Sequence, residues 1–562
     1  MEKKSAVWLV LIAIVVFGLI YSVISLTKNV GKTQSTVNME SSAKKLNTLY
    51  QTINVKTLAL QRGAVSEEEE LITILPDISE YPFVVNPTTD SFITIYSSTE
   101  KANEDENSWL VQVANLFNKS NPTVNGVPVS VGIRSIPSNL GAEFILAEKY
   151  TPDAYIPSSK LYGAMLESKE KKHTLVSDSI VKNVSGIVIS RSVKSKLQQN
   201  GGEVTADAVI NSVISSDVII GYTNPLSNED GLNYFIAMLQ AFDKDYLLSD
   251  NAVSKLRAYQ DKIPYVSYDI TQLQESNRNG TIDGFATNYQ AFYTNPSLRN
   301  NYDFIPFGYR QDSPVYSIGE LSNSKQEILN KFVEYCKSSD CQTIATNEGF
   351  NGRDEYSYGV AELDGNLVFD AQNLWKKEKN GTSDLTAVFV ADVSGSMEGS
   401  PLLKLKASLN RAATFIDENT NVGLITFSDS VNIALPIAKF DTKQKSYFSN
   451  AVKSMRASGA TAMYDAIVVA EHMLIEQLEK NPNTRLMLFV LTDGATNRGY
   501  YFEDIADVTR DLKIPVYTIG YNLGDEELEE LAAVADINEA SSMDADSDNV
   551  IYKLESLFNS QM

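Results

Sequence analysis

The sequence predicts an α/β protein in which an N-terminal transmembrane helix precedes a two-lobed α/β module and a C-terminal doubly wound parallel sheet. Three observations lead to this prediction. Short apolar runs alternate with helical patterns through two long segments, which is typical of parallel α/β folds. A polar, charged stretch separates these segments. Near the N-terminus lies an uncharged apolar run that is long enough to cross a bilayer.

Five regions are expected along the 562 residues. They are a transmembrane anchor (1–30), a juxtamembrane stalk (31–90), the two-lobed module (91–352), a linker (353–384) and the C-terminal domain (385–562).

The expected anchor is the apolar run at residues 6–26, AVWLVLIAIVVFGLIYSVISL. As a helix it would span about 31 Å, which matches the hydrocarbon core of a bilayer. A cleavable signal peptide is the alternative, but its apolar region is usually shorter and ends in a small-x-small site. Lysines flank the run on both sides, so charge orients it weakly. The length of this run, with no clear Ala-x-Ala after it, favours an uncleaved, single-pass anchor in the cell membrane. The large downstream domain and its predicted disulfide favour an extracytoplasmic location for the bulk of the chain.

Composition excludes several functions. The 71 acidic and 48 basic residues give a net charge of -23, which argues against a nucleic-acid partner because phosphate binding needs a basic face. The chain has two histidines, His173 and His472, so zinc sites and histidine-based triads have little material. Any metal is therefore expected to be held by oxygen.

The two cysteines, Cys336 and Cys341, are separated by four residues. This spacing allows a small disulfide loop in an oxidising compartment, and two free thiols are the alternative. No second cysteine pair exists to complete a zinc cluster. We predict a structural disulfide.

The C-terminal domain is expected to contain four nearly all-apolar strands, at 386–391, 422–427, 485–491 and 516–521. Such runs are typical of parallel strands covered on both faces. Residues at helical spacing lie between them.

Oxygen-bearing side chains follow the ends of these strands. The first strand leads into Asp392, Ser394 and Ser396, a later strand ends at Asp493, and a helix opens near Thr461. Because ligands bind at the carboxyl ends of strands in open parallel sheets, we expect these residues to meet at one edge. Two carboxylates and three hydroxyls predict a site for Mg²⁺, or for Mn²⁺ or Ca²⁺.

These motifs, Asp-Val-Ser-Gly-Ser-Met-x-Gly-x-Pro-Leu, Gly-Ala-Thr and Leu-Thr-Asp-Gly-Ala, resemble the metal-ion-dependent adhesion site of von Willebrand factor A domains. The resemblance covers about residues 385–558 and implies a Rossmann-like fold. It also implies a metal held by all five residues and a protein partner that supplies an Asp or Glu carboxylate. A fold with an empty site is the alternative.

Two enzymatic readings of the same loop fail on spacing. A phosphate-binding loop requires Gly-x4-Gly-Lys-Ser/Thr, which does not follow Gly395. A nucleophile elbow requires Gly-x-Ser-x-Gly, but Asp392 and Ser394 occupy the positions of the first glycine. No base–nucleophile pair is evident, so we expect a protein that is not an enzyme.

Residues 91–352 contain several short motifs, among them FITIYSS at 92–98, PDAYIPS at 152–158 and GTIDG at 280–284. In this order they resemble bacterial extracellular solute-binding proteins of the two-lobed class. The resemblance implies two lobes that close on a ligand. The residues expected to line the cleft, for a small polar or anionic solute, are Ser97, Ser98, Asn139, Thr223 and Tyr289. Ordinary turn and cap roles for these residues remain the alternative.

The sequence thus favours a membrane-anchored adhesion protein that captures a protein partner through a metal. A solute receptor or transport-associated sensor that uses the middle module is the second hypothesis.

Overall fold

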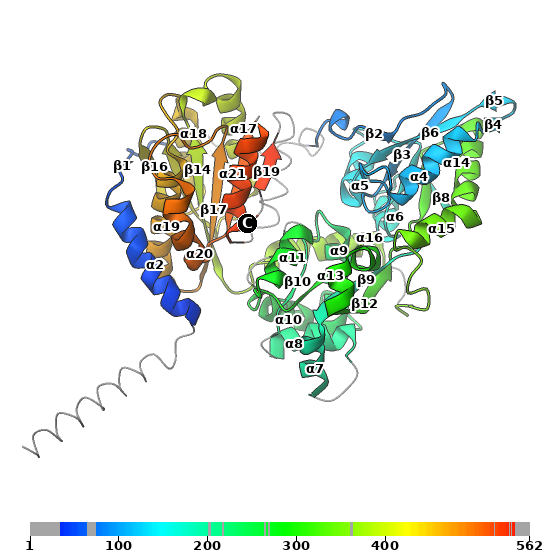
Figure 1. Ribbon diagram of the computed structural model, residues 1–562, viewed down its shortest axis with the longest axis horizontal. Helices are drawn as coiled ribbons and strands as arrows, with labels where there is room; N and C mark the ends of the chain where they lie inside the picture. Colours follow the sequence, from blue (N-terminus) through cyan, green and yellow to red (C-terminus); the bar gives the residue numbers. More distant parts are fainter. Residues whose placement is uncertain are drawn as a thin grey trace, which may run out of the picture.

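The computed structural model describes residues 34–63, 75–199, 204–215, 218–263, 266–267, 270–359, 363–521, 523–538, 540 and 542–545. The predicted anchor at 6–26 lies outside these residues. Within the described ranges, no helix combines the length and the apolar character needed to cross a membrane. The described residues form a C-terminal domain around a seven-stranded sheet and a middle module around two further large sheets (Figure 1).

The seven-stranded sheet has the order β1-β16-β15-β14-β17-β18-β19. All four predicted strands are present and pair in parallel. They are β14 (Asp384–Asp392), β15 (Asn421–Phe427), β17 (Thr484–Thr492) and β18 (Val516–Tyr521). Their side chains are buried on both faces of the sheet, which is why continuous apolar runs predicted them.

Helices cover both faces of this sheet. Two helices, α17 (Ser400–Phe415) and α18 (Thr442–Ser454), pack on one face. On the other face lie α19 (Met463–Lys480), α20 (Phe502–Leu512) and α21 (Asp525–Asp536). Within residues 385–562, two further strands were not expected: β16 (Val431–Lys439), which is antiparallel to β15, and β19 (Ser542–Ala545), which is parallel to β18.

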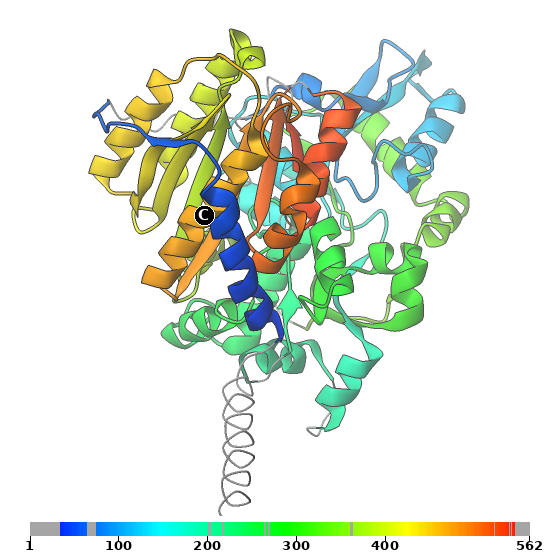
Figure 2. The same ribbon diagram turned by 60° about the vertical axis from the view of Figure 1, so that its left-hand side comes forward.

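Residues 34–63, expected to belong to a stalk, pack into the C-terminal domain instead. Helix α2 (Gln34–Tyr50) lies along α19 and α20, and both views of the molecule show this contact (Figures 1 and 2). Its Leu46 is buried in the core, and the ring of Tyr50 stacks on His472 at 3.9 Å. Strand β1 (Val55–Thr57) then pairs in parallel with β16 at the edge of the sheet. The C-terminal domain is therefore built from two distant parts of the chain.

The first lobe of the middle module surrounds a six-stranded sheet with the order β2-β6-β3-β7-β13-β8. Its strands are β2 (Phe83–Val85), β3 (Phe92–Ser97), β6 (Ser130–Ser135), β7 (Ala154–Ile156), β8 (His173–Ser177) and β13 (Val315–Ile318). Its main helices are α4 (Trp109–Lys119), α5 (Ser138–Leu146), α6 (Leu161–Ser168), α14 (Asn323–Cys336) and α15 (Ser339–Asn347).

The second lobe surrounds a four-stranded sheet with the order β10-β11-β9-β12. Its strands are β9 (Val184–Ser190), β10 (Ile220–Gly221), β11 (Gly284–Asn288) and β12 (Tyr302–Arg310). Its helices are α7 (Arg191–Gln199), α8 (Ala206–Ser215), α9 (Glu229–Phe242), α10 (Asp250–Gln260), α11 (Ile270–Arg278), α12 (Tyr289–Thr294) and α13 (Pro296–Asn301). The chain crosses between the lobes at residues 178–183 and 311–314.

The expected linker, residues 353–384, contains a packed helix. Helix α16 (Gly365–Glu378) contacts α6 of the first lobe and α9 and α10 of the second. Trp375 is fully buried and donates a hydrogen bond to the Tyr222 hydroxyl at 2.9 Å. Strand β14 begins only a few residues later, so α16 joins both lobes directly to the central strand of the C-terminal domain.

The predicted disulfide is not formed. Cys336 and Cys341 are both free and buried, at the end of α14 and near the start of α15. Both pack in the apolar core of the first lobe, where free cysteines behave as small hydrophobic residues. Burial raises the pKa of the Cys336 thiol well above its usual value, so this thiol remains protonated.

Candidate functional site

Asp392 is the last residue of β14 and is fully buried. Its Oδ1 accepts a hydrogen bond from the Ser394 backbone N–H at 2.7 Å, and its Oδ2 accepts one from the Thr492 hydroxyl at 2.5 Å. Because Thr492 lies on the neighbouring strand β17, the sheet itself fixes the orientation of this carboxylate at its carboxyl edge.

The two serines that follow Asp392 connect it to the second carboxylate. A short 3-10 turn at Gly395–Met397 brings Ser394 Oγ within 3.0 Å of Ser396 Oγ. The Ser396 hydroxyl then donates a hydrogen bond to Asp493 Oδ1 at 2.7 Å. Four of the five predicted residues thus lie in one continuous hydrogen-bonded group.

The loop that carries Thr461 is bonded to the same turn through its backbone. The Ser458 N–H donates to the Val393 carbonyl at 2.8 Å, and the Gly395 N–H donates to the Gly459 carbonyl at 2.9 Å. Gly459 has a φ of +89°, and a Cβ at this position would collide with the Asp429 carboxylate, so the loop requires glycine here. The Thr461 side chain is buried where these loops meet.

The electrostatics of the site favour a cation. Burial raises the pKa of Asp392 to about 6, and the neighbouring Asp493 carboxylate adds to this effect. Burial also raises the pKa of Asp493. Neither carboxylate forms an ion pair with a basic side chain of the described residues. Two carboxylates with three nearby hydroxyls make an all-oxygen donor set, which fits a hard divalent ion such as Mg²⁺.

The predicted metal site contains only two carboxylates, those of Asp392 and Asp493. Within the described ranges, no group of three or more His, Cys, Asp or Glu side chains could hold a metal. Hydroxyl groups or water would therefore complete the coordination of a cation bound at this edge.

Sequence reasoning missed two supporting residues. Thr492 reads as a strand residue, yet its hydroxyl anchors Asp392. Asn497 accepts a hydrogen bond from the Thr461 backbone N–H at 2.9 Å through its side-chain oxygen. The only sequence signal for Thr492 is its place directly before Asp493 at the end of an apolar run.

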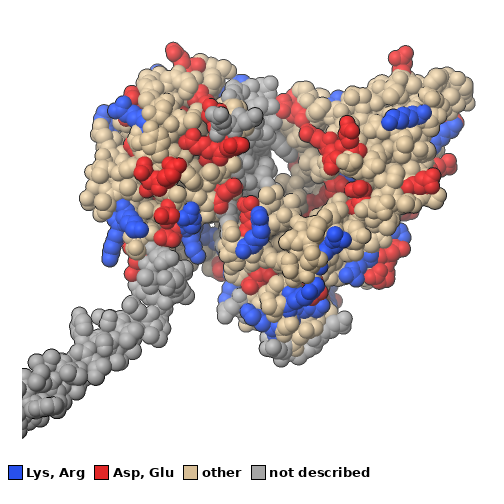
Figure 3. Space-filling model, in the orientation of Figure 1, with Lys and Arg blue, Asp and Glu red and all other residues tan. Residues whose placement is uncertain are grey.

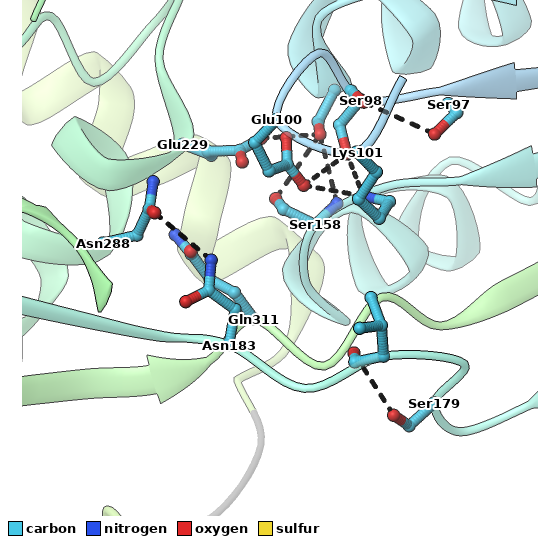
Figure 4. A network of polar contacts seen from close by, with 12 residues as sticks. Ser97, Ser98, Glu100, Lys101, Ser158, Ser179, Asn183, Glu229, Asn288 and Gln311 are labelled. Atoms are coloured by element: carbon cyan, nitrogen blue, oxygen red, sulfur yellow. Dashed lines mark hydrogen bonds and ion pairs between the residues drawn. The ribbon is translucent and has the colours of Figure 1, made fainter. Parts of the chain in front are cut away.

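The middle module contains a second polar cluster, at the junction of its lobes (Figure 4). Ser97 and Ser98 are buried at the end of β3, as expected for residues at the carboxyl edge of a strand. The Ser98 hydroxyl donates to Glu100 Oε1 at 2.7 Å. The ammonium of Lys101, which is fully buried, contacts both Ser98 and Glu100.

A hydrogen bond joins the lobes at this cluster. The hydroxyl of Ser138, the first residue of α5, donates to Glu229 Oε2 at 2.7 Å, and Glu229 is the first residue of α9. Asp230 follows and accepts hydrogen bonds from Gln311 at 2.6 Å and Asn288 at 2.9 Å. None of these five residues was predicted from the sequence.

The other predicted cleft residues have different surroundings. Asn139 lies next to Ser138 and is buried. Thr223 donates to the Asn228 side chain at 2.8 Å, which supports the N-terminus of α9. Tyr289 packs in an aromatic cluster with Phe292 and Phe304. Cap and core roles therefore account for Thr223 and Tyr289.

The lobe junction brings buried carboxyl groups close together, and binding of a small polar or anionic solute stays a prediction. Burial raises the pKa of Glu229 well above its usual value, and the nearby Glu100 carboxylate raises it further. Burial likewise raises the pKa of Asp230. Three carboxyl groups, those of Glu100, Glu229 and Asp230, therefore gather near one buried lysine, Lys101.

Residues 387–559 match the family model of the von Willebrand factor type A domain. The chain is 24% identical over 330 residues to a von Willebrand factor A domain-containing protein of Dictyostelium discoideum, an alignment that covers 58% of this chain and 29% of that relative. The chain therefore spans less than a third of this relative's length.

Among solved structures, the chain is similar to a von Willebrand factor type A protein from Catenulispora acidiphila, with 18% identity, a TM-score of 0.29, and coverage of 32% of this chain and 42% of that one. It is also similar to a periplasmic thiamin binding protein, with 11% identity, a TM-score of 0.38, and coverage of 52% and 99%. The family match confirms the predicted domain: the chain contains a von Willebrand factor type A domain at residues 387–559.

Proposed function

We propose that this protein is a membrane-anchored, extracytoplasmic binding protein that captures a protein partner through a divalent cation, without a catalytic role. The observation that carries the proposal is the convergence of the Asp392 and Asp493 carboxylates with the hydroxyls of Ser394 and Ser396. The match of residues 387–559 to the von Willebrand factor type A family also supports a protein-binding role for this site.

In this proposal Asp392, Ser394, Ser396, Thr461 and Asp493 hold Mg²⁺, Mn²⁺ or Ca²⁺, directly or through water. When bound, the cation offers a coordination position to an Asp or Glu carboxylate of the partner. The chain's own residues prepare this position. Thr492 and the Ser394 backbone fix Asp392, and the Ser396 hydroxyl turns Asp493 toward the same point.

A pull-down tests the proposal. The ectodomain from residue 31 onward is used as bait, with Mg²⁺ or with a chelator, and bound proteins are identified by mass spectrometry. We expect partners that are lost in chelator and lost with Asp493→Asn. The matched control is Asp507→Asn, which neutralises a largely exposed carboxylate on α20. Partner capture that is unchanged in chelator would contradict the proposal.

A second candidate function is solute binding by the middle module, and the polar cluster between the lobes favours it. Because Glu100, Glu229 and Asp230 gather there, we propose a cationic or neutral polar solute. Thermal unfolding of the ectodomain against a panel of amines, amino acids and oxyanions tests this proposal. Stabilisation by oxyanions alone would be the opposite of the expected result.

A further inference from the structure

The two faces of the type A domain carry opposite charge. On one face, α17 and α18 each contain three basic residues and no aspartate or glutamate. On the other face, α19, α20 and α21 contain four, four and six acidic residues, against a single lysine and a single arginine. Figure 3 shows acidic side chains (red) gathered on the side of this domain where α19, α20 and α21 lie. In a chain of net charge -23, the basic face is an exception that composition does not explain.

The basic face reaches the metal residues at one end. Helix α18 runs toward the carboxyl edge of the sheet, and the loop after it bonds to Val393 between the metal residues Asp392 and Ser394. Here the Lys406 ammonium donates to the carbonyls of Lys453 and Met455, and the Arg456 guanidinium donates to the same carbonyls.

In the part of the chain that the structure describes, Lys406, Lys453 and Arg456 at this end of the face form no ion pair with an acidic side chain. Burial and the nearby Arg456 charge lower the pKa of Lys406, as expected where cations crowd together. Capping of the α18 C-terminus accounts for the hydrogen bonds of Lys406 and Arg456. Helix capping does not explain the position of the Lys453 side chain, which is exposed.

A cavity of about 350 Å³ opens beside these residues. Its walls include Val393 and Ser458 from the metal-binding loops, Asn450 and Arg456 from α18 and the loop after it, and Gln61 from the N-terminal segment. Leu58 and Leu60 line it while remaining 45% and 43% exposed. Exposed apolar side chains next to a hollow are typical of protein-binding surfaces.

We infer that the partner captured at the metal is an acidic polypeptide segment that extends from the metal residues across this cavity onto Lys453 and Arg456. This inference rests on the proposed metal function and adds the chemistry of the partner. One carboxylate would complete the cation, further carboxylates would meet the basic end of α18, and an apolar side chain would contact the exposed leucines. A concave site beside a metal suits an extended peptide better than the flat surface of a membrane.

The test measures binding of two fluorescent peptides to the ectodomain in Mg²⁺ and in chelator. One is a short poly-glutamate peptide, and the other has the same length with a single Asp among Ser and Gly. The variants are Lys453→Glu and, to limit any loss of helix capping, Arg456→Gln. The matched control is Lys443→Glu, which reverses a charge on the same helix about 15 Å away, at about 1.5 Å per residue.

We expect Lys453→Glu to weaken poly-glutamate binding about tenfold and Arg456→Gln to weaken it less. As the salt concentration rises, the affinity of the wild type for poly-glutamate should fall more steeply than that of either variant. Binding of the single-Asp peptide should remain Mg²⁺-dependent and unchanged in both variants, which also shows that they fold.

Other outcomes distinguish a failure of the acidic-segment inference from a failure of the proposed metal function. Mg²⁺-dependent binding that Lys453→Glu and Lys443→Glu affect equally would overturn the acidic-segment inference alone. Binding of both peptides that is indifferent to chelator would overturn the metal function and the inference with it. Anionic vesicles that bind in place of poly-glutamate, or Lys453-dependent self-association of the ectodomain, would assign the basic face to a membrane or to a second copy.

Discussion

The Ser396 hydroxyl lies 2.7 Å from Asp493 Oδ1, although 97 residues separate the two in sequence. This contact joins the loop after β14 to the end of β17, so it connects the loop that follows Asp392 to the second carboxylate of the site.

Replacing Ser396 with alanine is expected to weaken Mn²⁺ binding about tenfold, because the site loses one oxygen ligand and the hydrogen bond that orients Asp493. Ser396 is exposed, so the metal-free stability should change by less than about 1 kcal/mol. Isothermal titration calorimetry with Mn²⁺ measures the first effect. Ser446→Ala is the control, since that hydroxyl donates to the Gly63 carbonyl away from the site; an equal loss in both variants would contradict a role for Ser396.

Saturating Mg²⁺ is expected to raise the unfolding midpoint of the type A domain, because the cation binds the folded state and relieves repulsion between Asp392 and Asp493. At a concentration about 100-fold above the dissociation constant, the gain is about 2.7 kcal/mol. Differential scanning calorimetry with Mg²⁺ and with chelator measures it. The gain should vanish in Asp493→Asn, and a gain that persists there would place the ion elsewhere.

Alanine at Gly459 should lower both stability and metal affinity. The backbone at residue 459 has a φ of +89°, and the new Cβ would collide with the Asp429 carboxylate. We expect this collision to displace the loop that carries Thr461. Gly399→Ala is a matched control, because Gly399 has the same φ of +89° but open space around it. We expect Gly399→Ala to cost about 1 kcal/mol from backbone strain and Gly459→Ala to cost more. Chemical denaturation compares them, and equal costs would show that the Asp429 contact relaxes freely.

Stability should fall with rising pH because of Glu471, which is fully buried in α19. Burial raises its pKa from 4.5 to about 8, and the nearby Thr509 hydroxyl opposes this only weakly. Since the folded-state pKa is the higher one, the stability that this carboxyl contributes is complete below pH 4.5 and is lost as the pH rises through 8. Unfolding free energies between pH 5 and pH 8.5 should decline by a few kcal/mol in the wild type. The decline should be smaller in Glu471→Gln and unchanged in Glu476→Gln, which alters a half-exposed residue on the same helix.

Glu229→Ala should loosen the two lobes of the middle module, because it removes the hydrogen bond from Ser138. Glu229→Gln keeps an acceptor for that hydroxyl and should retain the closed arrangement. Small-angle X-ray scattering of the ectodomain is expected to show a larger radius of gyration for Glu229→Ala alone. Identical scattering from all three proteins would show that helix α16 holds the lobes together without this contact.

The sequence predicted the central strands of the type A domain to within one or two residues, because strands buried on both faces are continuous apolar runs. Of the five residues that it named for a metal site, the structure joins Asp392, Ser394, Ser396 and Asp493 in one hydrogen-bonded group, because each lies at or just after the end of a strand. A role of the five in metal binding stays a prediction. Strand β16 was missed because polar residues and Pro436 interrupt its pattern. The roles of Lys101 and Glu229 could not be foreseen, because each depends on a partner brought near by the tertiary fold.

The assignment of residues 34–63 to a stalk failed for the same reason. Val55 pairs with Val431, and no local pattern in a three-residue strand points to a partner so far along the chain. Helix α16 lies in the expected linker for a similar reason. The charged residues at its C-terminal end interrupt the apolar pattern of the side that contacts both lobes.

The pairing of β1 with β16 also constrains how the protein is made. Strand β1 leaves the ribosome long before β16 exists, and at about 5–20 residues per second the interval is on the order of tens of seconds. During that time α2 and β1 have no sheet to join, while the whole middle module is available to fold. The type A domain can therefore complete its sheet only after the middle module has been synthesised. Until then, we expect α2 and β1 to need protection from premature association.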